Sequence, residues 1–424
     1  MADVNAVRVV FQGATVGALA ESRGRPGVYT FAYEPDFAAR GIELSPLVMP
    51  LAGPSVRTFP ELSRETFMGL PGLVADALPD RFGNLLINAD LSRQGPVPSS
   101  FTTLERLLYT GHRAMGALEF EPAMPLETGD PPQALALREL VESARRAIRG
   151  QFGRVAPQLI QVGTSAGGAR AKAVIGFNPT TTDIVSGQFD LPSGFEHWLL
   201  KFDGVNEEGQ LGPSGYFGRI EYAYWLMAQA AGIAMTECRL LLEERRAHFM
   251  TRRFDRVGNK KLHVQSLCAL RHLDFNTPYV YDYEEYLRAI LELGLGAPAL
   301  EEGFRRMVFN VVAKNCDDHT KNLAFLMDPE SGTWRLAPAF DMTFAHNPAP
   351  EKWTKQHQML VNGKARNIER GDLLAVAKKF SIKSGANIVA AVEDAVAFWP
   401  TFAWSAGLSE KLAAEVARKQ GLPG

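Results

Sequence analysis

A cluster of polar side chains lies between Asn315 and Asn322, where the sequence is NCDDHTKN. One further carboxylate, Asp341, follows nineteen positions later in the segment AFDMT. Phosphoryl transfer requires one carboxylate to orient the attacking hydroxyl, and an Asn and a second Asp to hold magnesium against the phosphates. Asp317 precedes Asn322 by five positions, the separation of base and magnesium-binding Asn in the protein-kinase pattern HRDxxxxN. The spacing therefore favours Asp317, rather than Asp318, as the catalytic base.

The flanking segments predict how this loop is held. The preceding segment, residues 301–315, carries apolar side chains at helical spacing, namely Phe304, Met307, Val308, Val311 and Val312. Two short strands are expected after the loop, at 323–328 and 334–340, joined by the turn-forming residues PESGT. A hairpin of this kind returns Asp341 to the side of the loop, so three polar groups converge. His319 and Lys321 are candidates for contacts with phosphate or substrate.

Two other interpretations of the cluster stay open at this point. An Asp-Asp-His-Thr-Lys-Asn run also suits an ordinary solvated loop. Carboxylate and imidazole groups also bind divalent metals, so the cluster is compatible with a metal-dependent hydrolase. The ligands of such a centre would be Asp317, Asp318, His319, His346 and His357. No HxH or HExxH spacing supports this alternative.

Composition limits the function classes. The chain has 424 residues, 46% of them hydrophobic, and a formal net charge of -2. A protein that grips nucleic acid unaided usually carries a basic surplus, so we expect any DNA contact to be shared with a partner. The three cysteines, Cys238, Cys268 and Cys316, form no CxxC pair, which argues against disulfides and structural zinc and fits a reducing cytoplasm. No secretion signal or membrane span is expected.

The pattern of elements predicts an α+β fold. Residues 7–33 alternate apolar and polar types, which indicates a small antiparallel sheet, and residues 67–88 and 101–109 indicate short helices packed on it. The proline-rich stretch 121–133 is a candidate linker. Strand-like runs around one long apolar helix follow, and helical patterns dominate beyond residue 252. We therefore predict three domains: a small N-terminal subdomain at 1–125, the small lobe of a two-lobed enzyme at 126–250, and a mainly helical large lobe at 251–424.

Three further segments suit nucleotide binding. The small residues of GTSAGGARAK, 163–172, would allow backbone N–H groups to approach a phosphate, although the segment by itself favours an ordinary flexible hairpin. Lys201 lies in the apolar run HWLLKF, where it could anchor phosphates and pair with Glu221 at the start of the next helix, or simply reach solvent. The segment TRRF, 251–254, is either an adenine-binding hinge or a plain connection between domains.

Nearly the whole chain resembles the HipA family, the serine/threonine kinase toxins of bacterial type II toxin-antitoxin pairs. VGALA and GLPGLVADALPDRFGN resemble the N-terminal subdomain of that family. SAGGARAK, HWLLKF, RRFDR, NCDDHTKN and LAPAFD resemble its kinase core. The resemblance implies a protein-kinase-like, two-lobed fold with a small α+β subdomain at the N-terminus.

The resemblance also implies roles for individual residues. Asp317 would be the catalytic base, Asn322 and Asp341 would bind Mg²⁺, and Lys201 would bind the phosphates of ATP. Further nucleotide contacts would come from Gly167, Gly168, Ala169, Arg170, Ala171 and Lys172 in the loop, from Arg252, Arg253 and Phe254 in the hinge, and from His319, Thr320 and Lys321. Ser165 falls where the family carries an autophosphorylated serine, and a phosphate there would repel ATP and compete for its donors.

The chain departs from known kinases in two places. Asp341 is followed by Met342 and Thr343, so no DFG motif is present and activation by a flipping Phe-Gly pair is not expected. Arg252 occupies a position that is acidic in a known family member, which leaves backbone groups as the expected adenine contacts. The chain shows no helix-turn-helix of its own.

The sequence therefore predicts an ATP- and Mg²⁺-dependent serine/threonine protein kinase, acting as a toxin linked to persistence. Its expected partners are a DNA-binding, HipB-like antitoxin, through which DNA would be contacted, and a protein substrate such as an aminoacyl-tRNA synthetase. Two alternatives are a small-molecule phosphotransferase and a catalytically weak, kinase-like corepressor of the antitoxin.

Overall fold

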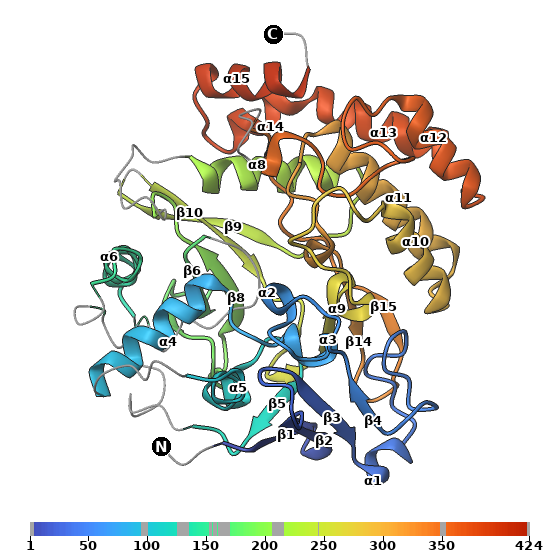
Figure 1. Cartoon of the computed structure of the whole chain (residues 1–424). Helices are drawn as coiled ribbons and strands as arrows, with labels where there is room; N and C mark the ends of the chain where they lie inside the picture. The colour runs from blue at the N-terminus through green and yellow to red at the C-terminus, as the bar shows by residue number, and fades with distance from the viewer. Residues whose placement is uncertain are drawn as a thin grey trace. The chain divides into compact units, whose positions relative to one another are not determined.

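The computed structural model describes residues 4–94, 101–124, 135–151, 155, 159, 170–205, 216–244, 246–347 and 353–421. The chain forms two compact units (Figure 1). Unit 1 comprises residues 1–215, 241–265 and 327–333, and unit 2 comprises residues 216–240, 266–326 and 334–424. The chain therefore crosses between the units several times, and each unit is built from segments that are distant in sequence.

Unit 1 begins with a five-stranded antiparallel sheet in the order β4-β3-β2-β1-β5. Its strands are β1 (Ala6–Phe11), β2 (Ala14–Glu21), β3 (Tyr29–Tyr33), β4 (Val56–Thr58) and β5 (Leu118–Glu121). Alternate residues of β3 are buried, as expected for a sheet with one face on the core. Gly17 in β2 passes so close to β3 that an added Cβ would lie 2.2 Å from the Ala32 carbonyl oxygen.

Short helices accompany this sheet. They are α1 (Pro35–Ala38), α2 (Arg64–Phe67), α3 (Gly72–Ala75), α4 (Arg81–Gln94), α5 (Thr103–Thr110) and the 3-10 turn η1 (Gly111–Arg113). A capping box starts α5, because the Thr102 hydroxyl accepts from the Glu105 N–H and the Glu105 carboxylate accepts from the Thr102 N–H. The sheet and short helices predicted before residue 110 are confirmed, whereas most of the predicted linker 121–133 lies outside the described residues.

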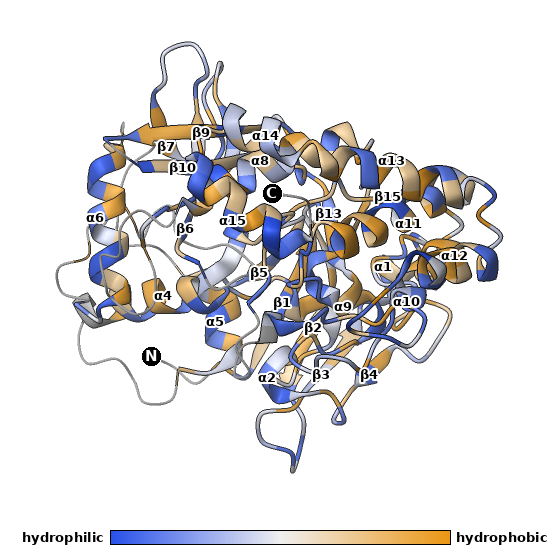
Figure 2. Cartoon of the chain, turned by 90° about the horizontal axis from the view of Figure 1, so that it is seen from above, coloured by the Kyte–Doolittle hydropathy of each residue, from blue (hydrophilic) through white to orange (hydrophobic). Residues whose placement is uncertain are grey.

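A second sheet of unit 1 has the order β7-β6-β8-β10-β9. Its strands are β6 (Lys172–Phe177), β7 (Ile184–Ser186), β8 (Glu196–Lys201), β9 (Cys238–Glu243) and β10 (Arg246–Arg252). Every residue of β6 is buried, and Ile175, Trp198 and Met250 belong to one apolar core with helix α6 (Leu137–Ile148). Figure 2 shows hydrophobic and hydrophilic residues on α6, as expected for a helix with one buried side. The short strands β11 (Arg256–Val257), β12 (Lys260–Lys261) and β13 (His263–Ser266) follow.

Unit 2 is mainly helical. Its helices are α8 (Phe217–Ala230), α9 (Leu267–Arg271), α10 (Tyr283–Glu292), α11 (Gly296–Val312), α12 (Arg370–Lys379), α13 (Gly385–Ala397), α14 (Trp399–Ser405) and α15 (Glu410–Gln420). Two 3-10 turns, η3 (Thr320–Asn322) and η4 (Trp353–Lys355), and the adjacent strands β14 (Ala324–Met327) and β15 (Trp334–Leu336) complete the described elements. Helix α11 packs against both α10 and α13 and forms the centre of the unit.

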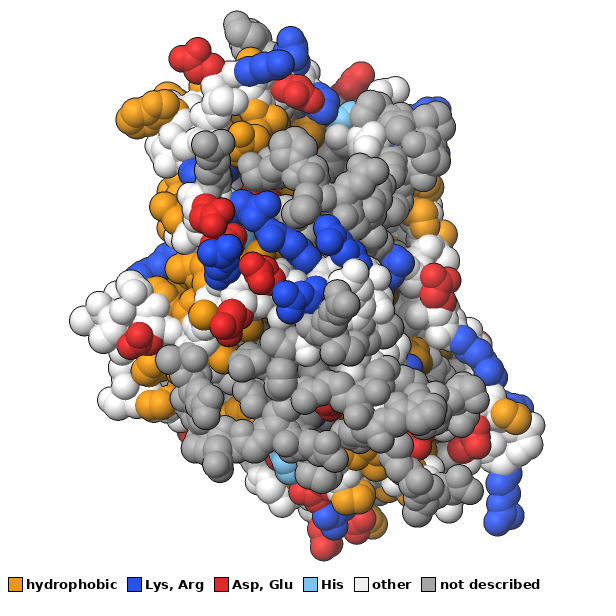
Figure 3. Space-filling view, turned by 90° about the vertical axis from the view of Figure 1, so that its left-hand side faces the viewer, with side chains coloured by type: hydrophobic (Ala, Val, Ile, Leu, Met, Phe, Trp, Pro, Cys, Tyr) orange, Lys and Arg blue, Asp and Glu red, His pale blue; other side chains and the backbone are white. Residues whose placement is uncertain are grey.

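The surface carries both signs of charge, in agreement with the net charge of -2. On the face in Figure 3, Lys and Arg side chains gather near Asp and Glu side chains rather than forming a purely basic surface. Within the ranges given above, no helix is both long enough and apolar enough to span a bilayer. The two compact units do not test the predicted division into domains at 1–125, 126–250 and 251–424, which stays a prediction.

Candidate catalytic loop

The predicted catalytic loop follows the buried helix α11 directly. Phe304, Met307 and Val308 on α11 are fully buried, as the apolar spacing predicted. The helix ends at Val312 and Ala313 caps it. The next residue, Lys314, adopts a left-handed backbone conformation with φ +57°. The N–H of Asn315 then donates to the carbonyl of Asn310 at 2.9 Å, which turns the chain out of the helix and into the loop.

Asn315 joins the loop to the segment that carries Asp341. Its side chain is buried, and Nδ2 donates to Oδ1 of Asn310 at 2.9 Å and to the backbone carbonyl of Asp341 at 3.3 Å. The expected return of the chain through the β14–β15 hairpin is confirmed by the two strands. The structure therefore brings Asp341 beside the loop, as the spacing predicted, and Asn315 is the residue that fixes it there.

Asp318 is an internal anchor of the loop. Its side chain is fully buried and accepts three hydrogen bonds, from the Tyr283 hydroxyl at 2.9 Å, from Nδ1 of His357 at 2.9 Å and from the Gln358 N–H at 2.8 Å. A buried carboxylate needs such partners, because an unpaired charge in the interior is very costly. The amide of Asn310 donates to the same Tyr283 hydroxyl at 2.9 Å, so the network continues into α11.

His357 is the cationic partner of Asp318. Burial alone would lower the pKa of His357, but the charge of Asp318 and hydrogen bonds to Asp318 and Cys316 raise it to about 10. The imidazole is therefore protonated at neutral pH and forms a buried ion pair. The Cys316 sulfur lies 3.9 Å from Nε2 of His357, so both ring nitrogens have a polar neighbour.

Asp317 has the opposite environment. Its side chain keeps 39% of its exposure, and its carboxylate lies 3.8 Å from Nε2 of His319. The backbone carbonyl of Asp317 accepts a hydrogen bond from Nδ2 of Asn322 at 2.9 Å. An accessible carboxylate can receive a substrate hydroxyl, whereas the fully buried Asp318 cannot, so the geometry agrees with the choice of Asp317 as base.

Asn322 and Asp341 fit a magnesium site in their chemistry. Because Nδ2 of Asn322 is engaged with Asp317, its Oδ1 is the atom left to bind a cation. Amide and carboxylate oxygens are the ligands that Mg²⁺ prefers, and Mg²⁺ typically takes only one or two protein groups together with phosphates and water. Asp341 has φ +53°, an uncommon backbone conformation for a non-glycine residue.

The other predicted residues of the loop pack around Phe275. The His319 ring lies 5.2 Å from the Phe275 ring, and the Lys321 ammonium lies 5.3 Å from the centre of the same ring. The Thr320 hydroxyl donates to the carbonyl of Leu273 at 3.0 Å. These contacts hold the turn η3, so the three side chains stabilise the loop whether or not they also contact nucleotide.

The ligands of the alternative metal centre are not assembled. His357 is paired with Asp318, as described above, and burial lowers the pKa of His346. Within the ranges that the structure describes, no group of three or more His, Cys, Asp or Glu residues is placed to hold a metal ion. The polar residues of the cluster instead form a hydrogen-bonded loop.

The predicted nucleotide residues of unit 1 lie on its second sheet. Lys201 ends β8, opposite Lys172 of β6 and Phe249 of β10, and its ammonium lies 5.7 Å from the centre of the Phe249 ring. Lys172 is buried and forms an ion pair with Asp80 at 3.0 Å. A phosphate would therefore have to compete with Asp80 for the Lys172 ammonium. The phosphate contact of Lys172 stays a prediction.

The structure describes only part of the predicted nucleotide loop. The carbonyl of Ala171 accepts from the Phe202 N–H at 3.0 Å, and Arg170 is partly buried. Ser165, Gly167, Gly168 and Ala169 lie outside the described residues. Glu221 is buried in α8 of unit 2, whereas Lys201 belongs to unit 1, so their pairing stays a prediction.

The predicted hinge continues from β10. Arg252 is exposed and pairs with Glu196 at 3.1 Å, and the Arg253 N–H donates to the His197 carbonyl at 2.9 Å. Phe254 follows at a partly buried position. The Arg253 guanidinium donates two hydrogen bonds, of 2.9 and 2.7 Å, to the buried carboxylate of Asp255. The N–H, Nε and Nη2 groups of Arg253 are thus engaged, and its adenine contact stays a prediction.

Sequence reasoning missed several supporting residues. Asn310 is a polar residue on the buried face of α11, and that mismatch with the apolar pattern was a usable signal. Tyr283 and His357 lie 35 and 39 positions from Asp318, so no local spacing connects them. The same holds for Asp80, the partner of Lys172.

Comparison with known proteins identifies the family. The HipA N-terminal domain family matches residues 7–121, and the HipA-like C-terminal domain family matches residues 164–399. A comparison with curated proteins finds no match.

A solved structure of a HipA protein shows the same fold. HipA in the Shewanella oneidensis MR-1 complex of HipA, HipB and operator DNA aligns with a TM-score of 0.67 and 16% identity, covering 98% of this chain and 95% of that chain. The Helicobacter pylori proinflammatory kinase CtkA gives a TM-score of only 0.35, with 13% identity over 60% of this chain and 92% of that chain, and supports no structural argument. The predicted α+β, HipA-like fold class is confirmed, and the chain belongs to the HipA family.

Proposed function

We propose that this chain is an ATP- and Mg²⁺-dependent serine/threonine protein kinase and the toxin of a type II toxin-antitoxin pair. The arrangement of the catalytic loop carries the proposal. An exposed Asp317 lies beside a fully buried Asp318, and hydrogen bonds hold Asn322 to Asp317 and Asp341 to Asn315. A solvated loop would need none of this internal bonding.

Each residue of the loop has a defined task in the proposal. Asp317 orients the hydroxyl of the acceptor and takes its proton, while Oδ1 of Asn322 and the carboxylate of Asp341 hold Mg²⁺. Bound Mg²⁺ neutralises charge on the phosphates. Lys201, the loop Gly167–Lys172, the hinge Arg252–Phe254 and the residues His319–Lys321 contribute to binding of ATP.

The proposed partners follow from the family. The Shewanella HipA was solved with HipB and operator DNA, which supports a HipB-like antitoxin for this chain and DNA contact through that antitoxin. The net charge of -2 supports a shared rather than independent DNA contact. An aminoacyl-tRNA synthetase as substrate, autophosphorylation of Ser165, a role in persistence and a cytoplasmic location complete the proposal.

Transfer of label from ATP tests the catalytic assignment. The chain would be incubated with labelled ATP and Mg²⁺, alone and with lysate proteins, and labelled peptides would be identified by mass spectrometry. We expect labelled serine or threonine from the wild type and a loss of roughly 10²–10⁴-fold in rate for Asp317→Asn, the usual contribution of a general base. Asp394→Asn, an exposed Asp of α13, is the matched control and should retain the wild-type rate.

The alternatives give different results in the same experiment. Label transferred to metabolites but to no protein would identify a small-molecule phosphotransferase. ATP binding without turnover, together with salt-sensitive operator binding only when the antitoxin is present, would identify a corepressor. Undiminished transfer by Asp317→Asn would overturn the assignment of the base.

A further inference from the structure

A cavity of about 980 Å³ opens in unit 2 at the segment that precedes α12. Its lining includes Tyr279, Lys355, Gln356, Lys364, Arg366 and Glu369. Three of these side chains are basic and one is acidic. Lys355, Lys364 and Arg366 are exposed, and the cavity is an open depression rather than a closed pocket.

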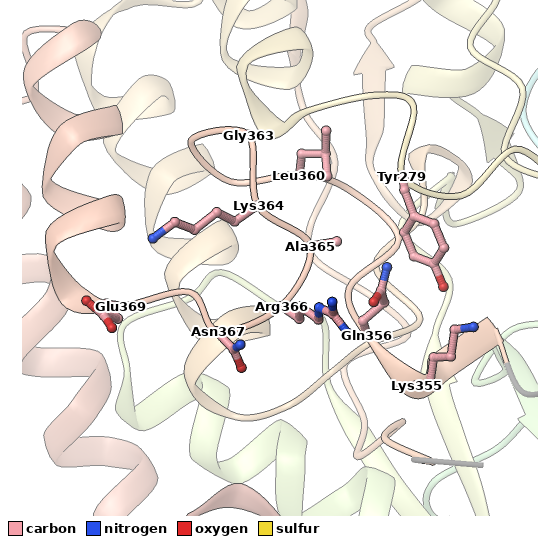
Figure 4. A pocket seen from close by; sticks show the side chains of 10 residues that line it. All are labelled: Tyr279, Lys355, Gln356, Leu360, Gly363, Lys364, Ala365, Arg366, Asn367 and Glu369. Carbon is pink, nitrogen blue, oxygen red and sulfur yellow. The ribbon is translucent and has the colours of Figure 1, made fainter. Parts of the chain in front are cut away.

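The basic groups differ in their availability. The Lys364 ammonium pairs with the Asp372 carboxylate at 2.9 Å, so its charge is already balanced. Arg366 is exposed and forms no ion pair with any residue that the structure describes. Figure 4 shows Arg366, Gln356, Tyr279 and Lys355 on one side of the cavity, while Lys364 points towards the other side. Within this group, Arg366 and Gln356 offer guanidinium and amide donors, and such donors suit carboxylates.

The cavity is fixed to the catalytic loop. Gln356 is followed by His357, which pairs with Asp318, and Asp318 is the neighbour of Asp317. Only two peptide links and one hydrogen bond therefore separate Gln356 from the proposed base.

Backbone hydrogen bonds hold the cavity wall in place. The His357 N–H donates to the Ala365 carbonyl at 3.0 Å, and the Tyr279 N–H donates to the Gln358 carbonyl at 2.9 Å. The wall that carries Arg366 is thus tied to the segment that pairs with Asp318.

We propose that this cavity docks an acidic segment of the protein substrate and thereby selects which serine or threonine reaches Asp317. The inference rests on the proposed kinase function. An extended peptide advances about 3.3–3.6 Å per residue, so the spacing between the acceptor and the acidic side chains decides whether one peptide reaches both Asp317 and the cavity. The chain has no general basic surplus, which favours a peptide over a nucleic acid as the occupant.

Binding of defined peptides to the full chain tests the proposal directly. The probes are fluorescent peptides with one serine and a short run of glutamates on either side, and the same peptides with glutamine in place of glutamate. We expect the wild type to bind the glutamate peptides more tightly in fluorescence anisotropy. Arg366→Gln should reduce that preference by about five- to tenfold, as expected for loss of one charge-assisted contact. Arg418→Gln, an exposed arginine of α15, is the matched control and should keep the full preference.

The kinase assay with the same peptides separates two kinds of failure. If the glutamate preference depends on Arg366 but neither the peptides nor the lysate proteins are labelled, docking stands and the kinase proposal fails. If both peptide types are phosphorylated and bound equally, the kinase proposal stands and docking is overturned. A single-stranded oligonucleotide that displaces the glutamate peptide and binds more tightly through Arg366 would also overturn the proposal, because the cavity would then be a nucleic-acid site.

Discussion

Nδ1 of His357 lies 2.9 Å from the carboxylate of Asp318, and this buried ion pair sits one residue from the exposed Asp317. Two adjacent aspartates thus have opposite surroundings. Asp318 is enclosed by three donors, whereas Asp317 keeps access to solvent. In the proposed kinase, Asp318 would have a structural role and Asp317 a chemical one, and mutation can separate the two roles.

Asp318→Asn should lower the free energy of unfolding by roughly 3–5 kcal/mol, because it leaves a buried His357 cation without its counter-charge. Asp317→Asn should change stability by less than about 0.5 kcal/mol, since its side chain is partly exposed. Urea denaturation of both variants measures the difference. Equal losses of unfolding free energy at the two positions would contradict the structural role of Asp318. An Asp318→Asn variant with the wild-type stability would contradict it too.

Stability should fall in the alkaline range because of His357. Burial opposes its charge, but the Asp318 carboxylate raises its pKa from 6.5 to about 10 in the folded protein. The folded state therefore binds the proton more tightly than the unfolded state. This stabilisation is complete below about pH 6.5 and is lost as the pH rises through 10, with a slope of at most about 1.4 kcal/mol per pH unit.

The measurement compares the pH dependence of urea denaturation in the wild type and in His357→Gln. The other titrating groups are shared, so the difference between the curves reports on His357 together with Asp318 and Cys316, the groups in contact with it. If His357→Gln does not fold, an NMR titration of the wild-type imidazole gives the same information. A His357 that loses its proton near pH 6.5 would refute the prediction.

Lys172 and Asp80 should behave as a structural ion pair in unit 1. Lys172→Met should cost roughly 3 kcal/mol of unfolding free energy, because it removes the cation that pairs with the buried Asp80 carboxylate. Adding Asp80→Leu should recover part of that loss, since an apolar pair replaces the ion pair while the Gly83 N–H loses the Asp80 carboxylate as its acceptor. Thermal or urea denaturation of the wild type and the variants gives the coupling free energy between Lys172 and Asp80. Loss of ATP binding in the stable double variant would instead support the phosphate contact predicted for Lys172.

Asp255 should be essential for the segment that follows β10. Burial alone would raise the pKa of Asp255, but the guanidinium groups of Arg253 and Arg256 and the Gly116 N–H lower it below its ordinary value. Asp255→Asn leaves two buried arginines without their shared anion, so we expect a loss of roughly 3–5 kcal/mol in urea denaturation. Asp190→Asn, at an exposed position, is the control with little expected effect. A stable Asp255→Asn would show that the arginines find other partners.

Local sequence patterns predicted the elements well, because their signals lie within one or two turns of chain. The apolar spacing of Phe304, Met307 and Val308 indicated α11, and the turn formers after residue 328 indicated the β14–β15 hairpin. The five-residue separation of Asp317 and Asn322 is also local. The hydrogen bond between these two residues lies within the same short loop.

Partners that are distant in sequence could not be predicted in this way. His357 appeared in the sequence only as a possible metal ligand, and Lys172 only as a possible phosphate contact. Each is instead engaged by a carboxylate from another part of its own unit, Asp318 and Asp80 respectively. Residue type and spacing indicate that a charge needs a partner, but tertiary packing decides which one it finds.

The two hydrogen bonds donated by the Asn315 amide have a consequence for the local opening of the loop. One amide group holds both the last turn of α11, through Asn310, and the segment of Asp341. Local opening of either segment breaks a bond to the same side chain, so the two should exchange their backbone hydrogens with solvent together, as one cooperative unit. The loop of Asp317 and the Asp341 segment would then be lost and regained in a single step, without a half-formed intermediate.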